Sequence, residues 1–418
     1  MNIKKSLCLV SSLFIAACGI SVTGCAPRNE VLKIYNWGDY INEDLIGEFE
    51  DWYFEETNER VQVKYETFDT NETMIMRIET QKADYDLVCP SDYMAERMIS
   101  SGLAQKVDRT IFDMSEEGLF YDGLAEIISP FDNNNEYFVP YCWGTFGIMY
   151  DTDRIEVGSE KAEEMNSWAA LWSDEWVSSS GKKRILMKDS VRDAYSLARI
   201  YSNTEELSEL SNGFTDYNEA YREKLISFFS YIDDEDEFDR AIKEAQDALI
   251  EQKKVVCKYE VDDGKNDMLA GTTDAWLGFF WSCDAALIMQ ETGGDHFYYT
   301  VPKEGSNVWL DGWIIPKYAK NVKAANYFLK FINTHEYAAE NLEYMGTSMA
   351  LKSVMEEARE EIESDDTFED DYFEGFKEMY LEMMFPSAEV LSRCGVMRDF
   401  GMKRNTDLDS MWIDVKTM

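Results

Sequence analysis

Apolar runs and stretches of helical periodicity alternate along the first hundred residues. Residues 31–37 are mostly apolar and predict a strand, and apolar residues then recur at helical spacing up to residue 56. Residues 61–65 alternate as a second strand, and a helix opens at Asn71. Residues 85–90 predict a third, buried strand. Strands that alternate with helices predict the α/β fold class, with a parallel sheet covered by helices on both faces.

The same alternation resumes after an interruption near residue 140. A proline and a glycine lie within the apolar run 138–145, which we interpret as a crossing into a second domain before a strand at 146–150. The further predicted strands are residues 184–187, 255–260 and 275–281, and the further predicted helices are residues 167–173, 190–201, several between 217 and 251, and 284–291. Residues 308–316 indicate a crossing back, and the remainder is predicted to be helical.

These crossings predict two lobes joined by a hinge. We expect lobe 1 to comprise residues 31–141 plus about 308–346, and lobe 2 to comprise residues 142–307 plus about 347–418. Two α/β lobes joined in this way suit closure around a ligand that binds in the cleft between them.

The N-terminus has the pattern of a lipoprotein signal peptide. Lys4 and Lys5 precede an apolar stretch that is too short to span a membrane. Residues 22–25 resemble the bacterial lipobox, in which the cysteine, here Cys25, is acylated; Cys18 is a weaker competing site. We therefore expect residues 1–24 to be removed and residues 25–30 to form a lipid-anchored linker. The protein should be exported and held at the bacterial cell membrane, facing the periplasm or the cell exterior.

Charge and cysteine usage narrow the possible partners. The 82 acidic residues outnumber the 40 basic residues, which gives a formal net charge of −42. This balance opposes binding of nucleic acid or anionic lipid and attracts cations. The cysteines after Cys25 are single and widely spaced, so they predict neither a disulfide framework nor a zinc site. We expect no metal and no cofactor.

Aromatic rings and carboxylates gather where two predicted strands end. Trp37, Asp39 and Tyr40 follow the first strand, and Ser91 and Tyr93 follow the third. The carboxyl ends of strands in an open α/β sheet are where ligands bind, so these side chains should meet. Tryptophan and tyrosine faces attract cations, and a carboxylate adds charge pairing. The pattern indicates a small organic cation as ligand, and the alternative is that these aromatic residues belong to the core.

Several segments, in the same order along most of the chain, resemble the bacterial spermidine/putrescine-binding proteins of ABC importers. The segments are residues 35–40, 85–93, 139–144, 168–172 and 302–311. The resemblance implies a two-lobed periplasmic-binding-protein-like fold with a hinge and a ligand cleft between the lobes. It also implies a monomer that captures putrescine or spermidine by lobe closure and delivers it to an ABC importer permease, touching the membrane only through its lipid anchor.

The resemblance implies a ligand sandwiched by aromatic rings, with its ammonium groups held by carboxylates. Trp37 and Tyr93 would form the wall of one lobe, with Trp281 and Trp309 opposite. The full set of implied ligand-binding residues is Trp37, Asp39, Tyr40, Ser91, Tyr93, Asp193, Trp281, Asp284, Trp309 and Asp311. An alkyl-diamine needs apolar walls for its methylene groups and acceptors at its ends, because an ammonium group only donates hydrogen bonds.

Asp284 bears on the choice between putrescine and spermidine. It follows Trp281 by three positions, as in the putrescine-preferring branch of the family, where this carboxylate shortens the span between amines. The alternative is an acid at a helix N-terminus, stabilised by the helix dipole. The preference between the two amines stays open.

Three positions depart from the family pattern. Thr347 stands where the family often has a tyrosine, and Met397 or Arg398 stands where a glutamine often contributes. We expect Arg398 to face outward or to pair with an acid, because a cation in the cleft would repel an amine. Ser190 falls at a family carboxylate position, and we interpret the neighbouring Asp189 as a cap of the following helix.

Two rival functions have weaker support. A secreted glycosidase needs only two carboxyl groups about 5–9 Å apart, which so acidic a chain supplies in many places. The two histidines and the lack of G-x-S-x-G and H-E-x-x-H motifs give little support to serine or zinc hydrolases. A lipoprotein of the same fold could bind a sugar, an amino-alcohol or a metal, but sugars need mixed donors and acceptors, whereas acceptors dominate this site. We therefore expect a binding protein and not an enzyme.

Overall fold

The computed structural model describes residues 27–114, 118–121, 123–261, 266–268, 270–292, 296–365 and 375–418. The predicted signal peptide and both candidate acylation sites, Cys18 and Cys25, lie outside the described residues. None of the helices in these ranges combines the length and the hydropathy that a membrane span requires.

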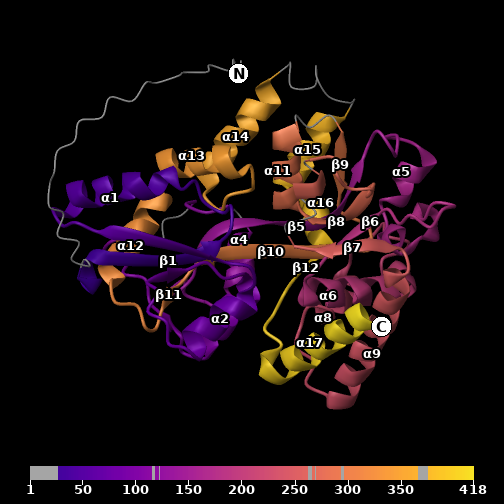
Figure 1. Ribbon diagram of the computed structural model, residues 1–418, viewed down its shortest axis with the longest axis horizontal. Coiled ribbons are helices and arrows are strands. Elements are labelled where there is room, and N and C mark those ends of the chain that lie inside the picture. Colours follow the sequence, from indigo (N-terminus) through magenta and orange to yellow (C-terminus); the bar gives the residue numbers. More distant parts are fainter. Residues whose placement is uncertain are drawn as a thin grey trace.

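Lobe 1 is built on a parallel three-stranded sheet. Strand β1 (Val31–Trp37) lies between β2 (Gln62–Phe68) and β3 (Leu87–Val88). Helix α1 (Asp44–Thr57) connects β1 to β2, and α2 (Asn71–Glu79) connects β2 to β3, as the alternating pattern predicts. Figure 1 shows α1 above and α2 below these strands. The remaining elements of this lobe are η1 (Arg28–Glu30), α3 (Asp92–Ser100), β4 (Ala104–Gln105), α4 (Leu124–Ile128), β11 (Ile315–Pro316), α12 (Val322–Ile332), α13 (His335–Met345) and α14 (Lys352–Ser364).

Lobe 2 contains a mixed sheet of seven strands, in the order β12-β10-β5-β8-β6-β7, with β9 also paired to β5. Its strands are β5 (Val139–Asp151), β6 (Ile185–Lys188), β7 (Val256–Glu260), β8 (Leu277–Trp281), β9 (Phe297–Thr300), β10 (Ser306–Trp313) and β12 (Cys394–Val396). Strand β6 runs parallel to β7 and β8, whereas β5 runs antiparallel to β8, β9 and β10. The prediction of a parallel sheet is therefore right for lobe 1 and wrong for lobe 2, because β5 and β10 enter this sheet from the crossings.

Helices cover the sheet of lobe 2 and extend beyond it. They are α5 (Glu160–Glu164), η2 (Trp168–Trp172), η3 (Asp174–Trp176), α6 (Val191–Ser202), α7 (Thr204–Leu210), α8 (Glu219–Ser227), α9 (Glu235–Lys253), α11 (Ser282–Thr292), α15 (Phe376–Met384), α16 (Ala388–Ser392) and α17 (Gly401–Thr417). The C-terminal helix α17 packs against α9 and α6, which places the chain end on this lobe (Figure 1).

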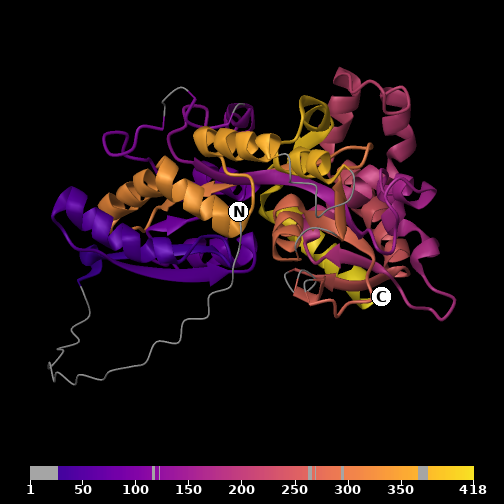
Figure 2. The same ribbon diagram turned by 90° about the horizontal axis from the view of Figure 1, so that it is seen from above.

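The crossings between the lobes are two long antiparallel strands. Figure 2 shows β5 running from one lobe into the other, where the pattern predicted a break and a second strand. Proline fits in β5 because Pro140 pairs with Gly312 where the register of β10 shifts. Gly144 allows close approach of the return strand, since a Cβ atom there would lie 2.7 Å from the ring of Trp309.

The C-terminal segment passes from lobe 1 to lobe 2 later in the sequence than expected. Residues 347–364 were predicted in lobe 2, but α14 packs on α13 of lobe 1. Ala338, Leu351 and Val354 form a buried cluster between these two helices. Helix α15 is the first of this segment to pack against β9 and α11 of lobe 2. The change of lobe therefore falls after α14 and not near residue 346.

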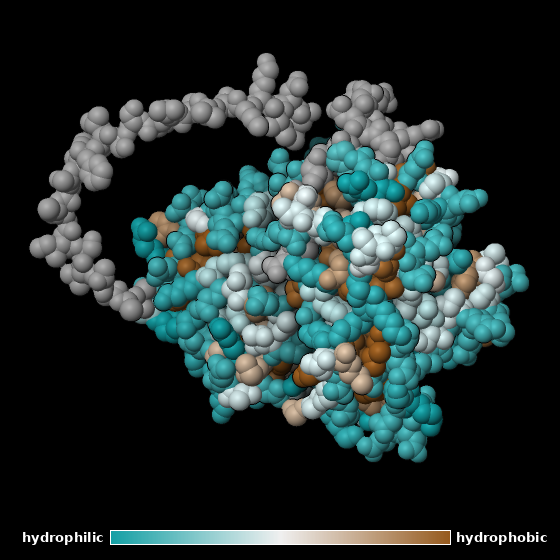
Figure 3. All heavy atoms as spheres, turned by 45° about the vertical axis from the view of Figure 1, so that its right-hand side comes forward, coloured by the Kyte–Doolittle hydropathy of each residue, from teal (hydrophilic) through white to brown (hydrophobic). Residues whose placement is uncertain are grey.

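The surface is mostly hydrophilic, in keeping with the acidic composition. Figure 3 shows hydrophilic residues over most of the visible face, with smaller hydrophobic areas between them. Cys89 and Cys142 are buried like small apolar side chains, whereas Cys257 is exposed.

Candidate functional site

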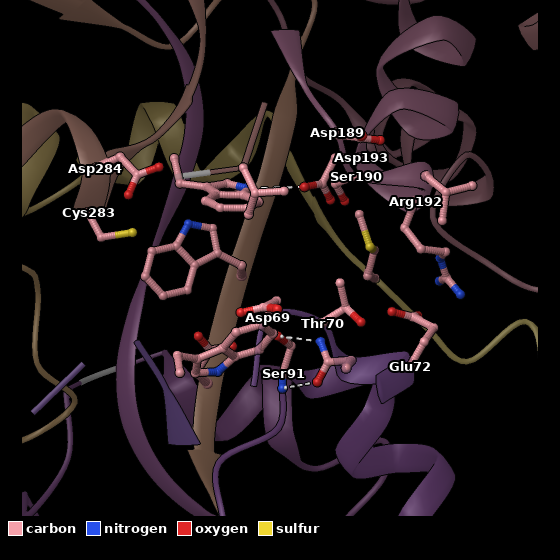
Figure 4. A pocket seen from close by; sticks show the side chains of 18 of the residues that line it. Asp69, Thr70, Glu72, Ser91, Asp189, Ser190, Arg192, Asp193, Cys283 and Asp284 are labelled. Carbon is pink, nitrogen blue, oxygen red and sulfur yellow. Dashed lines mark hydrogen bonds between the residues drawn. The ribbon is translucent and has the colours of Figure 1, made fainter. Parts of the chain in front are cut away.

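A cavity of about 560 Å³ lies between the lobes, and all ten predicted site residues line it. Its wall combines the ends of β1 and β3 from lobe 1 with the starts of α6 and α11 and the crossing strand β10. In Figure 4, Asp69, Thr70, Glu72 and Ser91 lie on one side of the space, and Asp189, Asp193 and Asp284 lie on the other. A volume of this size suits a small organic ligand.

The lobe 1 wall contains two aromatic side chains, Trp37 and Tyr93, and an amide, Asn71, holds the second of them. Trp37 packs on Phe68 with ring centroids 4.4 Å apart. Asn71 Nδ2 donates to Ser91 Oγ at 3.0 Å and to the Tyr93 hydroxyl at 3.1 Å. The sequence singled out Ser91 and Tyr93 but missed Asn71, whose position at the start of α2 marks only a helix opening. Asn71 fixes the orientation of both predicted residues.

Asp311 lines the cavity and lies on β10 opposite a β-bulge of β5. The register between β10 and β5 shifts between Asp311 and Gly312, and such bulges redirect side chains near binding sites. The Tyr40 hydroxyl donates to Asp311 Oδ2 at 2.9 Å. Asp311 Oδ1 is buried and accepts no hydrogen bond from any described residue. Burial raises the pKa of Asp311 to about 6 and outweighs the lowering effect of the nearby Ser91 and Tyr40 side chains. The site therefore holds a buried acceptor that a ligand donor can satisfy.

Asp193 lies in the first turn of α6, on the lobe 2 side. Trp281 Nε1 donates to Asp193 Oδ2 at 3.0 Å, which joins a predicted ring to a predicted acceptor. Burial raises the pKa of Asp193 to about 6, against hydrogen bonds from Ser190 and Trp281 and the charge of Arg192. Like Asp311, this carboxyl is buried and pays a desolvation penalty that a cationic partner would offset.

Trp309 lies deep in the cavity, whereas Asp39 lies near its opening. Trp309 is buried, and its Nε1 donates to the backbone carbonyl of Thr145 at 3.3 Å. Asp39 is exposed and has a φ of 52°, a left-handed conformation that aspartate tolerates better than most residues. Asp39, which the resemblance implied as an amine acceptor, therefore lines the rim of the cavity.

Asp284 lines the cavity but already has a cationic partner. Its Oδ2 lies 2.6 Å from Nζ of Lys188, a fully buried lysine at the end of β6. The sequence offered one signal of this pair, a single lysine that continues the apolar run 185–187. The predicted role of Asp284 as a ligand acceptor is thus altered by a contact that the resemblance did not imply.

A second unexpected cation, Arg192, lies at the cavity wall. Its guanidinium carbon is 4.6 Å from the ring centroid of Tyr93, across the boundary between the lobes. Arg192 Nη1 also donates to Asn405 Oδ1 at 3.0 Å. Among the described residues that line the cavity, Arg192 is the one cationic side chain, against nine carboxyl groups. The cavity is therefore strongly acidic.

The residues at or beside the positions that depart from the family pattern make different contacts. Arg398 pairs with Glu96, which confirms the prediction that it meets an acid. Asp189 was interpreted as a helix cap, but the cap position of α6 is Ser190, and Asp189 instead accepts from Lys416 Nζ at 2.7 Å. Thr347 and Met397 both line the cavity. The cap interpretation failed because the C-terminal helix, distant in sequence, supplies the partner of Asp189.

Known proteins resemble most of this chain. A family model described as bacterial extracellular solute-binding protein matches residues 51–370. A spermidine/putrescine-binding periplasmic protein of Salmonella typhimurium is 28% identical over 323 residues, which cover 77% of this chain and 78% of the relative. A putrescine-binding periplasmic protein of Pseudomonas aeruginosa is 24% identical over 405 residues, which cover 95% of each chain.

A solved structure agrees with these sequence relatives. The spermidine/putrescine ABC transporter substrate-binding protein PotD from Streptococcus pneumoniae superposes with a TM-score of 0.63 at 26% identity, covering 93% of this chain and 98% of that one. This similarity supports the two-lobed binding-protein fold. Because the family model covers most of the chain, the chain belongs to the family of bacterial extracellular solute-binding proteins, which are exported transport proteins and not enzymes.

Proposed function

We propose that this protein captures a polyamine, putrescine or spermidine, between its lobes and delivers it to the permease of an ABC importer. The relatives named above are described as binding these amines. The ten residues Trp37, Asp39, Tyr40, Ser91, Tyr93, Asp193, Trp281, Asp284, Trp309 and Asp311 form the proposed site. In it, aromatic rings contact the methylene groups, and the carboxylates of Asp193 and Asp311 accept hydrogen bonds from the ammonium groups.

The observation that carries this proposal is the state of Asp311. Its Oδ1 is buried on the cavity wall and has no hydrogen-bond partner among the described residues. A buried carboxylate oxygen that accepts no hydrogen bond is costly, and an ammonium group supplies both the missing donor and the opposite charge. The excess of carboxyl groups along the wall disfavours an anionic ligand.

We further propose that the mature protein is a monomer anchored by acyl chains on Cys25. The lipobox-like residues 22–25 support this anchor, because they follow the apolar segment of the signal and place a glycine before the cysteine. Two or three acyl chains hold a protein at a membrane durably, whereas one chain binds only marginally. The anchored protein would then release its ligand to a permease in the same membrane.

A thermal-shift series on the lipid-free protein tests the ligand class. Putrescine and spermidine should raise the melting temperature, because a ligand at a hundredfold excess over Kd adds about 2.7 kcal/mol to the free energy of unfolding. Maltose and glutamate should leave it unchanged. The proposal fails if neither amine stabilises the protein and one of the other ligands does.

A further inference from the structure

Lys188 is buried behind the cavity wall, where three oxygen atoms surround its ammonium group. Its Nζ lies 2.6 Å from Asp284 Oδ2, 3.3 Å from Glu260 Oε1 and 2.5 Å from the backbone carbonyl of Val261. The carbonyl accepts a hydrogen bond from this ammonium group, and the two carboxylates pair with its charge. Burial lowers the pKa of Lys188, but the carboxylates of Asp284 and Glu260 outweigh burial and leave the pKa raised. Lys188 is therefore a permanent cation.

Two members of the predicted amine site contact this internal cation. Asp284 lines the cavity, whereas Lys188 and Glu260 lie behind the wall. Lys188 Nζ is also 4.6 Å from the ring centroid of Trp281, within the range of a cation–π interaction. In Figure 4, Asp284 lies beside Cys283 on one side of the drawn indole rings, and Asp193 lies on the other. The protein thus supplies its own ammonium group at the Asp284 end of the cleft.

We propose, on the basis of the polyamine function above, that Lys188 determines specificity by taking the place of a ligand ammonium at Asp284. The ammonium groups of the ligand then meet Asp311 and Asp193, whose charges are not balanced by a lysine. A triamine would bring a third ammonium into the cleft without an acceptor at Asp284, and it would lose hydration there without compensation. The cleft therefore selects a diamine over a triamine.

A charge-balanced double variant tests this role. Lys188→Met with Glu260→Gln removes one positive and one negative charge, so Asp284 loses its cation while the net charge of the cluster stays the same. Calorimetry should show that the affinity for spermidine, relative to that for putrescine, rises at least tenfold. Adding Asp284→Asn to this variant should remove the gain. An unchanged affinity ratio in a folded double variant overturns the proposal.

A single variant tests the same role without disrupting the buried lysine. Asp284→Asn leaves Lys188 paired with Glu260, and we expect it to lower putrescine affinity by less than Asp311→Asn does, which should lower it at least tenfold. An equal loss in both variants would show that Asp284 holds a ligand ammonium directly and would overturn the proposal. Tighter binding of spermidine than putrescine by the unmodified protein would also overturn it. A protein that binds neither amine would refute the proposed function instead.

Discussion

The guanidinium group of Arg398 donates to both carboxylate oxygens of Glu96, with Nε 2.9 Å from Oε2 and Nη2 2.5 Å from Oε1. Glu96 lies on α3 of lobe 1, whereas Arg398 lies between β12 and α17 of lobe 2. The backbone amide of Asp399 donates to the same carboxylate at 2.9 Å. Paired bonds of this kind are stronger and more directional than a single contact. The pair therefore holds the lobes together without a ligand.

Breaking this pair should open the empty protein. In Glu96→Gln, the loss of charge weakens both bonds, and we expect the radius of gyration measured by X-ray scattering to increase without ligand and to decrease again with a saturating amine. Glu79→Gln is the control, because Glu79 pairs at 2.7 Å with Arg97 within lobe 1. An equal increase in both variants would show that the Glu96 pair does not hold the lobes.

The buried carboxyl groups of Asp311 and Asp193 should account for most of the electrostatic contribution to amine affinity. Asp311→Asn or Asp193→Asn should weaken amine binding at least tenfold, about 1.4 kcal/mol, because each variant leaves a buried ammonium group poorly paired. Exposed Glu360 on α14 supplies the control, and Glu360→Gln should change the affinity little. Equal, small effects at all three positions in calorimetry would show that the overall negative charge attracts the amine without a shaped site.

Amine affinity should fall as the pH falls through about 6. The pKa values of Asp193 and Asp311 are both raised to about 6 by burial, and the amine binds the ionised carboxylates. Below that pH, protons compete with the ligand at both positions, and each group weakens binding by about tenfold per pH unit. Calorimetry between pH 5 and pH 8 measures this slope. Asp193→Asn should have a shallower slope, and an affinity independent of pH would contradict the assignment of these acceptors.

Asp193 and Asp311 also make the stability of the empty protein depend on pH. Whereas amine affinity should rise with pH, the contribution of these two groups to folding should fall. A carboxyl group whose pKa is higher in the folded than in the unfolded protein favours folding at low pH, and this contribution is lost as the pH rises from about 4 to about 6. Thermal unfolding of the empty protein should therefore show Asp193→Asn gaining stability relative to the unmodified protein above pH 6. A relative loss of stability there would show that Asp193 already has a cationic partner.

Local pattern predicted the aromatic wall but not the internal cations. Trp37 and Tyr93 could be placed together because the carboxyl ends of neighbouring parallel strands share one edge of a sheet. The contacts of Lys188 with Asp284 and of Arg192 with Tyr93 join segments from different parts of the chain, so no local periodicity encodes them. The same reason explains Asp189, whose partner Lys416 lies on the last helix.

Proline and glycine at residues 140 and 144 misled the interpretation of the first crossing. These residues usually interrupt central strands, yet β5 continues through both. Their presence follows from the contacts of the strand: Pro140 lies next to the bulge in β5, and Gly144 leaves room for a ring of the return strand. The sequence of β5 alone contains neither partner, which is why the pattern predicted a break.

Gly144→Ala should therefore weaken amine binding through Trp309. A Cβ atom at this position would lie 2.1 Å from Ser282 Oγ and 2.7 Å from Trp309 Cζ2, so the indole ring must move away from its place on the cavity wall. We expect at least tenfold weaker amine binding together with a lower melting temperature. Gly147→Ala is a matched control on the same strand, because its Cβ would meet Tyr299 and the backbone of Thr300, outside the cavity. It should lower the melting temperature but leave the affinity of the folded protein within about threefold of the unmodified one. Equal losses of affinity in the two variants, measured by calorimetry well below both melting temperatures, would mean that disturbance of β5 itself, and not displacement of Trp309, impairs the site.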